Sequence, residues 1–285
     1  MGDEENTEAQ KNASLDVTIA PLRGWTHLEL QEVWEYRDLI WSFAVRNFRV
    51  RYRQMALGPL WSILSPLIDM IIFSTIFGSL AKLPSEGIPY SVFTYTALIP
   101  WGYFSGVATS TAGSLVSEMD VISKIYFPRL VIPLSSILSL LFDTIISLLI
   151  LVGMVLYYHF PITWKVLLLP LYLLLAAGAG MGIGLWLATL AVQYRDTRNL
   201  AGYGLQVLKF LTPVVYSASL IPEKWQILYN LNPMYWVVEG FRWIFLDTGL
   251  MPNILLSISV LLVVILFVTG LYVFRHTERT IVDWL

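Results

Sequence analysis

Three charged residues lie inside long apolar stretches of the sequence, where a charge is costly. They are Asp69, Asp143 and Lys209, and each falls in a run of the kind that crosses a lipid bilayer. Charged groups at such positions usually face a cavity or one another. The chemistry open to them is a proton or ion relay. The structural alternative is an ion pair, or a residue wetted by a polar channel, and it is favoured because one lysine can neutralise one aspartate without any transport role.

The segment 221–249, IPEKWQILYNLNPMYWVVEGFRWIFLDTG, is rich in aromatic residues and is interrupted by proline. Pro222 and Pro233 divide it into pieces of about 222–231 and 234–247, and neither piece is long enough to cross a bilayer. The segment is therefore predicted to be a re-entrant helical hairpin at the outer face of the membrane.

The rings of this hairpin suggest a path for a substrate. Glu239 and Arg242 are three residues apart and are expected to pair on one helix. The flat faces of the rings fit either an ordinary interfacial aromatic belt or an exit on which sugar rings stack and slide, as bases do on aromatic side chains. The residues of the candidate exit are Trp225, Tyr229, Tyr235, Trp236, Phe241 and Trp243.

The stretch 46–53, RNFRVRYR, holds four arginines directly before the first apolar run. At 100° per residue, one side of a helix here is an apolar stripe, and Arg46, Arg49 and Arg53 fall opposite it. The stripe consists of Trp41, Ala44, Val45, Phe48, Tyr52 and Met55. This pattern predicts an amphipathic helix over 35–57 that lies in the membrane interface, with Arg51 at the edge of the stripe. The expected anchors and the corner into the membrane are Arg46, Arg49, Arg53, Gly58 and Pro59.

Catalytic motifs are missing from the sequence. There is no G-x-x-x-x-G-K-[ST] loop, no G-x-S-x-G, and no clustered histidine spacing. We therefore expect no catalytic residue, no metal site and no cofactor in this chain. A net charge of −2 also gives no basic field for nucleic acid.

The composition indicates an all-α integral membrane protein. Hydrophobic residues make up 56% of the chain and charged residues 13%, against about 25% charged in soluble domains. With the N-terminus inside, 11 Lys and Arg fall in cytoplasmic flanks and 4 in outer loops, so both termini are predicted to be cytoplasmic. Six transmembrane helices are expected, at about 60–81, 90–117, 131–157, 166–192, 200–220 and 254–274.

Three regions follow from these elements. Residues 1–34 are polar and acidic at the start, and we expect a cytoplasmic tail and linker, disordered over about 1–20, and no signal peptide. Residues 35–57 form the interfacial helix, and 58–285 form the six-span domain. Small residues four apart, such as Gly180 and Gly184, predict close helix packing, more within one subunit than between subunits.

Six short motifs occur in order: RVRYRQMALGPLWSILSPL, LIPWGYF, SKIYFPRLVIPL, VQYRDTRN, LTPVVYS and YNLNPMYWVVEGFRW. Together they resemble the membrane-spanning permease subunit of ABC transporters that export lipid-linked polysaccharides of the O-antigen or teichoic-acid type. The resemblance covers about residues 35–280 and leaves the acidic tail outside.

The resemblance implies a homodimer in the bacterial inner membrane that works with two copies of a nucleotide-binding ATPase subunit. ATP and Mg would be bound by that partner, in agreement with the missing P-loop. The substrate would be a lipid-linked glycan. A short segment between spans two and three would dock the ATPase, and the interfacial helix can also reach it. The docking residues implied by the resemblance are Glu118, Asp120, Lys124, Tyr126, Phe127 and Arg129.

Three other functions stay open from the sequence. The first is an ABC exporter of another cargo, such as a drug, haem or lipid. The second is an ion-coupled carrier that uses the three intramembrane charges. The third is a membrane-embedded glycosyl- or acyltransferase, for which no cluster of catalytic residues is visible.

Overall fold

The computed structural model describes residues 30–53, 55, 57–58, 60–118, 127–194 and 196–280 of the 285-residue chain. The tail predicted to be disordered over 1–20 lies outside these residues. Every regular element in the described part of the chain is helical, and no strand occurs there. The prediction of an all-helical chain is confirmed for this part.

Four helical stretches are long and apolar enough to cross a membrane. At about 1.5 Å per residue, each can traverse a hydrocarbon core about 30 Å thick. Their bounds lie close to four of the six predicted spans. They are α4 (Leu60–Phe73) with its π-helical continuation η1 (Ser74–Leu80), α7 (Val131–Tyr157), the pair η2 (Trp164–Leu168) and α8 (Leu169–Gln193), and α12 (Ile254–Thr280).

The other two predicted spans differ from these four. Helix α5 (Tyr90–Ser117) has the predicted bounds, but many hydroxyl side chains lower its hydropathy. Helix α9 (Thr197–Phe210) has only 14 residues, and the chain turns before the short η3 (Ala218–Leu220). Pro213 accounts for this early end, because proline lacks an amide donor and disfavours helix in the residue before it. The six-span count therefore stays a prediction.

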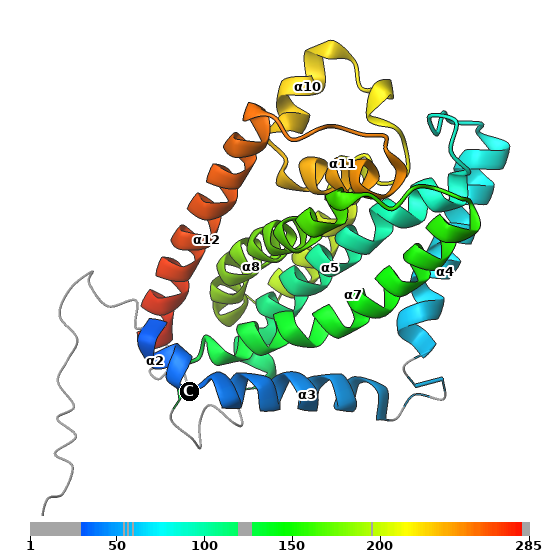
Figure 1. The fold of residues 1–285 in the computed structure, drawn as a ribbon. Coiled ribbons are helices and arrows are strands. Elements are labelled where there is room, and N and C mark those ends of the chain that lie inside the picture. The colour runs from blue at the N-terminus through cyan, green and yellow to red at the C-terminus, as the bar shows by residue number, and fades with distance from the viewer. Residues whose placement is uncertain are drawn as a thin grey trace, which may run out of the picture.

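Helix α5 lies at the centre of the bundle and packs most extensively against α8 (Figure 1). Glycines of α8 allow this approach. A β-carbon at Gly184 would lie 2.5 Å from Thr111 Cβ of α5, and one at Gly182 would lie 3.0 Å from Leu266 of α12. The small residues of α8 thus serve packing within one subunit, as predicted.

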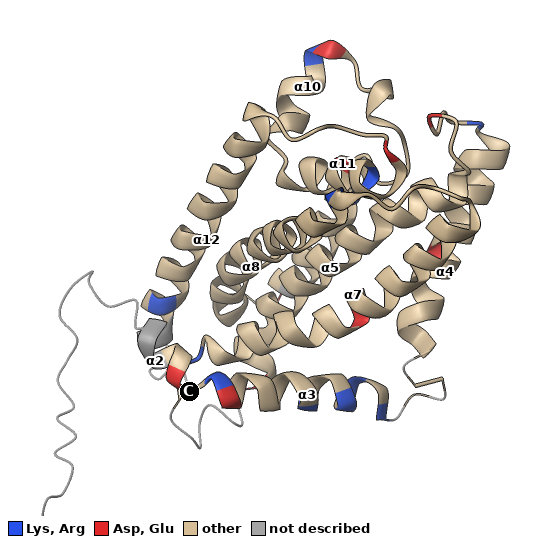
Figure 2. Cartoon of the chain, viewed as in Figure 1, with Lys and Arg blue, Asp and Glu red and all other residues tan. Residues whose placement is uncertain are grey.

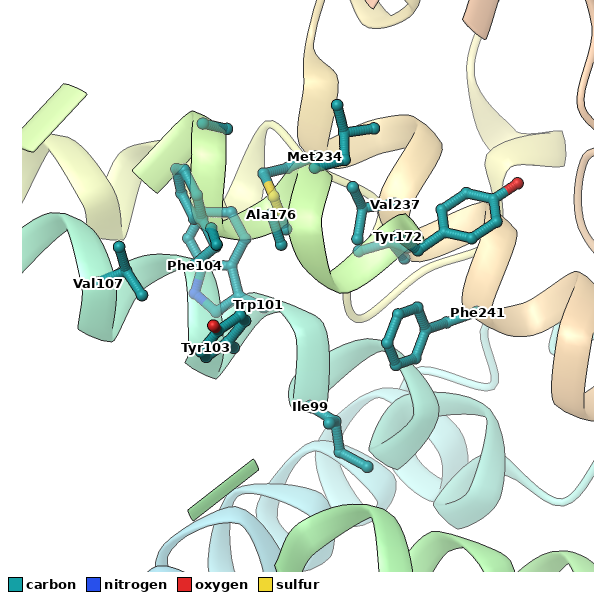
Figure 3. Close-up of a cluster of buried hydrophobic side chains, with 14 of the residues drawn as sticks. Ile99, Trp101, Tyr103, Phe104, Val107, Tyr172, Ala176, Met234, Val237 and Phe241 are labelled. Atoms are coloured by element: carbon teal, nitrogen blue, oxygen red, sulfur yellow. The ribbon is translucent and has the colours of Figure 1, made fainter. Parts of the chain in front are cut away.

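The core fills the space between α5, α8 and α11 (Pro233–Leu246). Figure 3 shows part of this core, with Trp101 and Phe104 of α5 on the side of Met234 of α11, and Tyr172 of α8 on the side of Phe241 of α11. All five side chains are buried. Their burial fixes α11 against one end of the bundle.

Helix α3 (Arg37–Arg53), preceded by the short α2 (Leu30–Glu35), lies across the opposite end of the bundle from α10 (Glu223–Asn230) and α11 (Figure 1). Figure 2 shows charged residues along α3 and around α10 and α11, whereas the long helices between them carry few. Two charged ends around an apolar middle are the distribution expected of a chain embedded in a bilayer.

Candidate functional site

The three intramembrane charges line one cavity. A groove of about 260 Å³ lies among α4, α5, α7 and α9, and Asp69, Asp143 and Lys209 all contribute to its wall. The rest of the wall is rich in hydroxyl groups. Those side chains are Ser62, Ser65, Tyr103, Ser105, Thr144 and Ser147. The chain thus places a polar groove inside an otherwise apolar set of helices.

We call this groove the polar groove. One of its walls carries an ion pair. Lys209 Nζ of α9 lies 3.5 Å from Asp69 Oδ2 of α4, and 4.7 Å from the centroid of the Phe73 ring. The lysine side chain is 18% exposed and the aspartate 47%. The pairing predicted as the structural alternative is therefore present, with the carboxylate open to the groove.

Asp143 has different partners, and the sequence did not reveal them. Its carboxylate accepts hydrogen bonds from Arg51 and from the Tyr52 hydroxyl, at 2.7 Å for the latter, and both donors belong to α3. Arg51 also donates to Ser139 at 3.4 Å. Burial, together with the Asp143 hydrogen bond, raises the pKa of Tyr52, so the hydroxyl stays protonated and donates.

These contacts correct the expected orientation of α3. The stripe with Tyr52 faces α7 of the same chain, where Phe48 and Trp41 make edge-to-face contacts with Phe142. A helical wheel separates an apolar face from a polar one, but it does not distinguish a lipid-facing surface from a protein-facing one. Arg51, predicted at the edge of the stripe, joins the two helices through its ion pair with Asp143.

The predicted anchors of α3 divide into two groups. Arg49 and Arg53 are exposed, as an interfacial anchor requires. Arg46 is half-buried and donates to Glu118 at 2.6 Å. Gly58 has φ +51°, in the left-handed region that glycine adopts without strain, which fits a corner after α3. Pro59 lies outside the described residues.

The segment predicted to dock the ATPase is attached to α3 at both of its ends. Glu118 closes the ion pair with Arg46, and Phe127 packs edge-to-face on Phe43 with ring centroids 5.8 Å apart. Arg129 is half-buried just beyond. The remaining docking residues, Asp120, Lys124 and Tyr126, lie outside the described residues.

The aromatic exit needs a correction. Four of the rings are at most 7% exposed, because α11 packs into the core and against neighbouring loops on all its faces: Tyr235, Trp236, Phe241 and Trp243. A buried ring has no free face for a sugar, so these four cannot form the predicted stacking surface. Of the six rings, Trp225 is 50% exposed, and Tyr229 is partly exposed.

The predicted pair on α11 is confirmed. Arg242 donates to Glu239 at 2.7 Å, and both side chains are almost completely buried. Arg242 also donates to the carbonyls of Val214 at 3.1 Å and Tyr216 at 3.3 Å. The guanidinium thus ties α11 to the turn that follows α9.

Residues 38–246 match the model of the ABC-2 type transporter family. The chain belongs to this family. The match includes the polar groove, α3 and both helices of the predicted hairpin, and it confirms the resemblance inferred from the six motifs. The chain is thus a permease of the inner membrane.

Curated relatives of this ABC-2 permease share most of its length. It is 29% identical to the O-antigen export system permease protein RfbA of Klebsiella pneumoniae over 85% of this chain and 92% of the relative. It is 29% identical to RfbA of Myxococcus xanthus over 76% and 84%. The polysialic acid transport protein KpsM of Escherichia coli is 24% identical over 82% and 92%.

Proposed function

We propose that this ABC-2 permease is the membrane subunit of a transporter that exports a lipid-linked, O-antigen-like polysaccharide, with ATP hydrolysed in a separate nucleotide-binding subunit. The names of the relatives support a polysaccharide cargo. The observation in the structure that carries the proposal is the polar groove. Its hydroxyl and charged groups are unsuited to hydrocarbon and suited to a hydrated, hydroxyl-rich chain.

The same groove supports a homodimer of six-span subunits. In this proposal α5 and α9 join the four apolar helices as spans, and α10 and α11 form the re-entrant hairpin. Asp69 is 47% exposed at its side chain, and a charge so open needs cover from lipid. A second copy of the chain across the groove provides that cover and encloses a path between the two subunits.

Coupling to the ATPase follows the contacts of α3. ATP and Mg bind in the partner, the segment between Glu118 and Phe127 docks on it, and its movement passes to α3 through the contacts with Arg46 and Phe43. The pair of Arg51 and Asp143 then carries the movement to α7, which lines the groove. This chain makes and breaks no covalent bond.

The aromatic exit is now restricted to Trp225 and Tyr229 of α10. Trp225 presents a half-exposed ring with Lys224 Nζ 5.7 Å from its centroid. Replacing Trp225 by Ala should slow glycan export if sugars stack there, whereas Trp243→Ala would mainly reduce the amount of folded protein. Normal export by Trp225→Ala would remove the stacking hypothesis.

Reconstitution tests the function directly. The permease and its ATPase subunit are placed in proteoliposomes with a lipid-linked glycan, and the glycan that becomes protected from an external glycosidase is measured. MgATP should be required, and a partner with an inactive ATP site should give none. Protection driven by a proton gradient without ATP would favour the ion-coupled carrier, and ATP-driven movement of a lipid without glycan would favour another cargo.

A further inference from the structure

A second polar cavity lies between α3 and the bundle. It has a volume of about 250 Å³, is open on one side, and is lined by α3, the last turns of α5 and the first turns of α7. Seven of its nine lining residues are polar, and they include Asn47, Arg51, Ser114, Glu118 and Ser136. A lining of this kind excludes an acyl chain as the natural occupant. We call this space the α3 cavity.

Ser114 is the unusual member of this lining. Its residue is 1% exposed, and its hydroxyl has no hydrogen-bond partner among the described residues. Buried hydroxyl groups are normally paired, so an unpaired one that lines a cavity points to a ligand or water that completes it. Ser117 and Ser136 donate to backbone carbonyls at 3.4 and 3.2 Å, which leaves their oxygens free to accept.

The charges around the α3 cavity are balanced. Arg51 is paired with Asp143, and Glu118 is paired with Arg46 at 2.6 Å. A phosphate or an ammonium ion would have to compete with one of these pairs. A neutral ligand would not, because a carboxylate and a guanidinium each retain further acceptor or donor positions. The cavity therefore favours a neutral ligand with several hydroxyl groups.

We propose that the α3 cavity binds one neutral polyhydroxyl group. Two sources supply this chemistry: a sugar ring of the cargo, which rests on the function proposed above, and the glycerol headgroup of a membrane lipid. The volume is below the range of about 300–1,000 Å³ for drug-sized ligands, so a single ring or headgroup fits and a longer glycan does not. Ser114 donates to the ligand, and the serines and Glu118 accept from it.

The chain contains no cysteine, which permits a direct test of occupancy. Ser114→Cys introduces a single thiol in this subunit, in the cavity wall. The permease with its ATPase subunit is placed in phosphatidylcholine nanodiscs, a small water-soluble thiol reagent is added, and modification of this chain is followed by mass spectrometry. A matched variant, Thr109→Cys, places a thiol on an exposed part of the same helix.

Two ligands are tested separately: glucose added to the solution, and phosphatidylglycerol replacing part of the phosphatidylcholine. At ten times its dissociation constant, a ligand should slow modification of the Ser114→Cys thiol about tenfold, and it should leave Thr109→Cys unchanged. Slowing by glucose identifies a sugar site, and slowing by phosphatidylglycerol alone identifies a lipid site. No slowing by either ligand overturns the proposal.

A further variant tests whether the thiol is modified through the α3 cavity. Val50 lines the cavity from α3 and is 62% exposed, so Val50→Trp covers the mouth without entering the core. Combined with Ser114→Cys, it should slow modification without any ligand and abolish further protection. If Ser114→Cys does not fold, Ser110→Cys in the same wall replaces it. Labelling needs neither ATP nor export, so this proposal and the proposed function can fail independently.

Discussion

The most completely buried charge in the described part of the chain, Arg242 at 1% side-chain exposure, forms its direct ion pair with Glu239. Replacing Glu239 by Ala leaves this buried guanidinium without its hydrogen-bonded carboxylate. Breaking a buried pair in this way costs about 3–5 kcal/mol. We therefore expect a clear fall in the thermal unfolding temperature of the purified permease and in its yield.

A double variant distinguishes two effects: the cost of leaving Arg242 unpaired, and the net contribution of the ion pair to the stability of the fold. Glu239→Leu with Arg242→Met replaces both charges by apolar groups of similar length, and such exchanges are often close to neutral. It should be more stable than Glu239→Ala. Lys224→Ala on α10 is the control on an exposed residue. A double variant as unstable as the single one would show that the carbonyl contacts of Arg242, rather than the ion pair, hold α11.

Individual pairings were predictable from sequence when helical spacing or the cost of an unpaired intramembrane charge required them. The pair of Glu239 and Arg242 follows from helical spacing, and that of Lys209 with an aspartate from the cost of charge in a membrane. The partners of Asp143 lie 91 and 92 positions away along the chain. No sequence pattern shows which residues of α3 lie beside which residues of α7. Arg51 and Tyr52 could therefore not be assigned to Asp143 from the sequence.

At the level of helices, the contact between α5 and α8 sets the width of the bundle. A β-carbon at Gly184 would lie 2.9 Å from the Ala108 carbonyl as well as close to Thr111, and backbone cannot give way as a side chain can. Gly184→Ala should push the helices apart and destabilise the fold by about 1–3 kcal/mol. Thermal unfolding of the purified permease measures this effect.

Gly102 provides the matched control for that substitution. It lies on the central helix α5, and among the described residues no atom beyond its own stretch of helix lies within 4 Å of a β-carbon built there. Gly102→Ala should therefore keep or slightly raise the stability, because alanine favours helix over glycine by about 1 kcal/mol. If the two alanine variants unfold at the same temperature, close packing at Gly184 is not limiting.

The contact of α3 with α7 is the second feature at this level. Arg51→Ala or Asp143→Asn should weaken it by about 1.5–3 kcal/mol, the range for a hydrogen bond to a charged group. Because α3 also holds both ends of the docking segment, ATP hydrolysis should continue while export falls. The measurement is the amount of glycan exported per ATP hydrolysed in proteoliposomes.

The matched control is Arg53→Ala, which removes an exposed arginine from the same helix. It should leave the ratio of export to hydrolysis unchanged. The double variant Arg51→Ala with Asp143→Asn should be no worse than either single variant, since both remove the same contact. Additive losses would show that the two residues act separately and that the pair does not transmit movement.

Helix bounds were predicted well where the apolar pattern is long, as for α7 and α8, and poorly where proline and tertiary packing decide. The predicted span at 200–220 ends as a helix at Phe210, and the turn that follows is fixed by Arg242, far along the chain. The rings of α11 were assigned to an exit because sequence shows aromatic content but not burial. Their interior position follows from contacts with α5 and α8.

For the whole molecule, the polar groove distinguishes the proposed exporter from an ion-coupled carrier. A relay needs charged groups that exchange protons in series. Here Asp143 is held by α3, whereas Lys209 is held by Asp69, so the three groups occupy two separate pairs. This division favours a hydrated path over a relay, and it indicates that polarity rather than titration is the property needed.

Substitutions at Asp69 and Lys209 separate these two properties. Asp69→Asn removes the titrating group but keeps the polarity, so export should stay within about twofold of the wild type, or about 0.4 kcal/mol. Asp69→Leu with Lys209→Leu removes both charges and makes that side of the groove apolar. Glycan export should then fall about tenfold, equivalent to about 1.4 kcal/mol, because the cargo loses hydrated contacts, while ATP hydrolysis and assembly with the partner persist.

Dissipating the proton gradient should not change export by the wild type. Loss of export in Asp69→Asn, together with sensitivity to the gradient, would contradict the hydrated path and restore the relay.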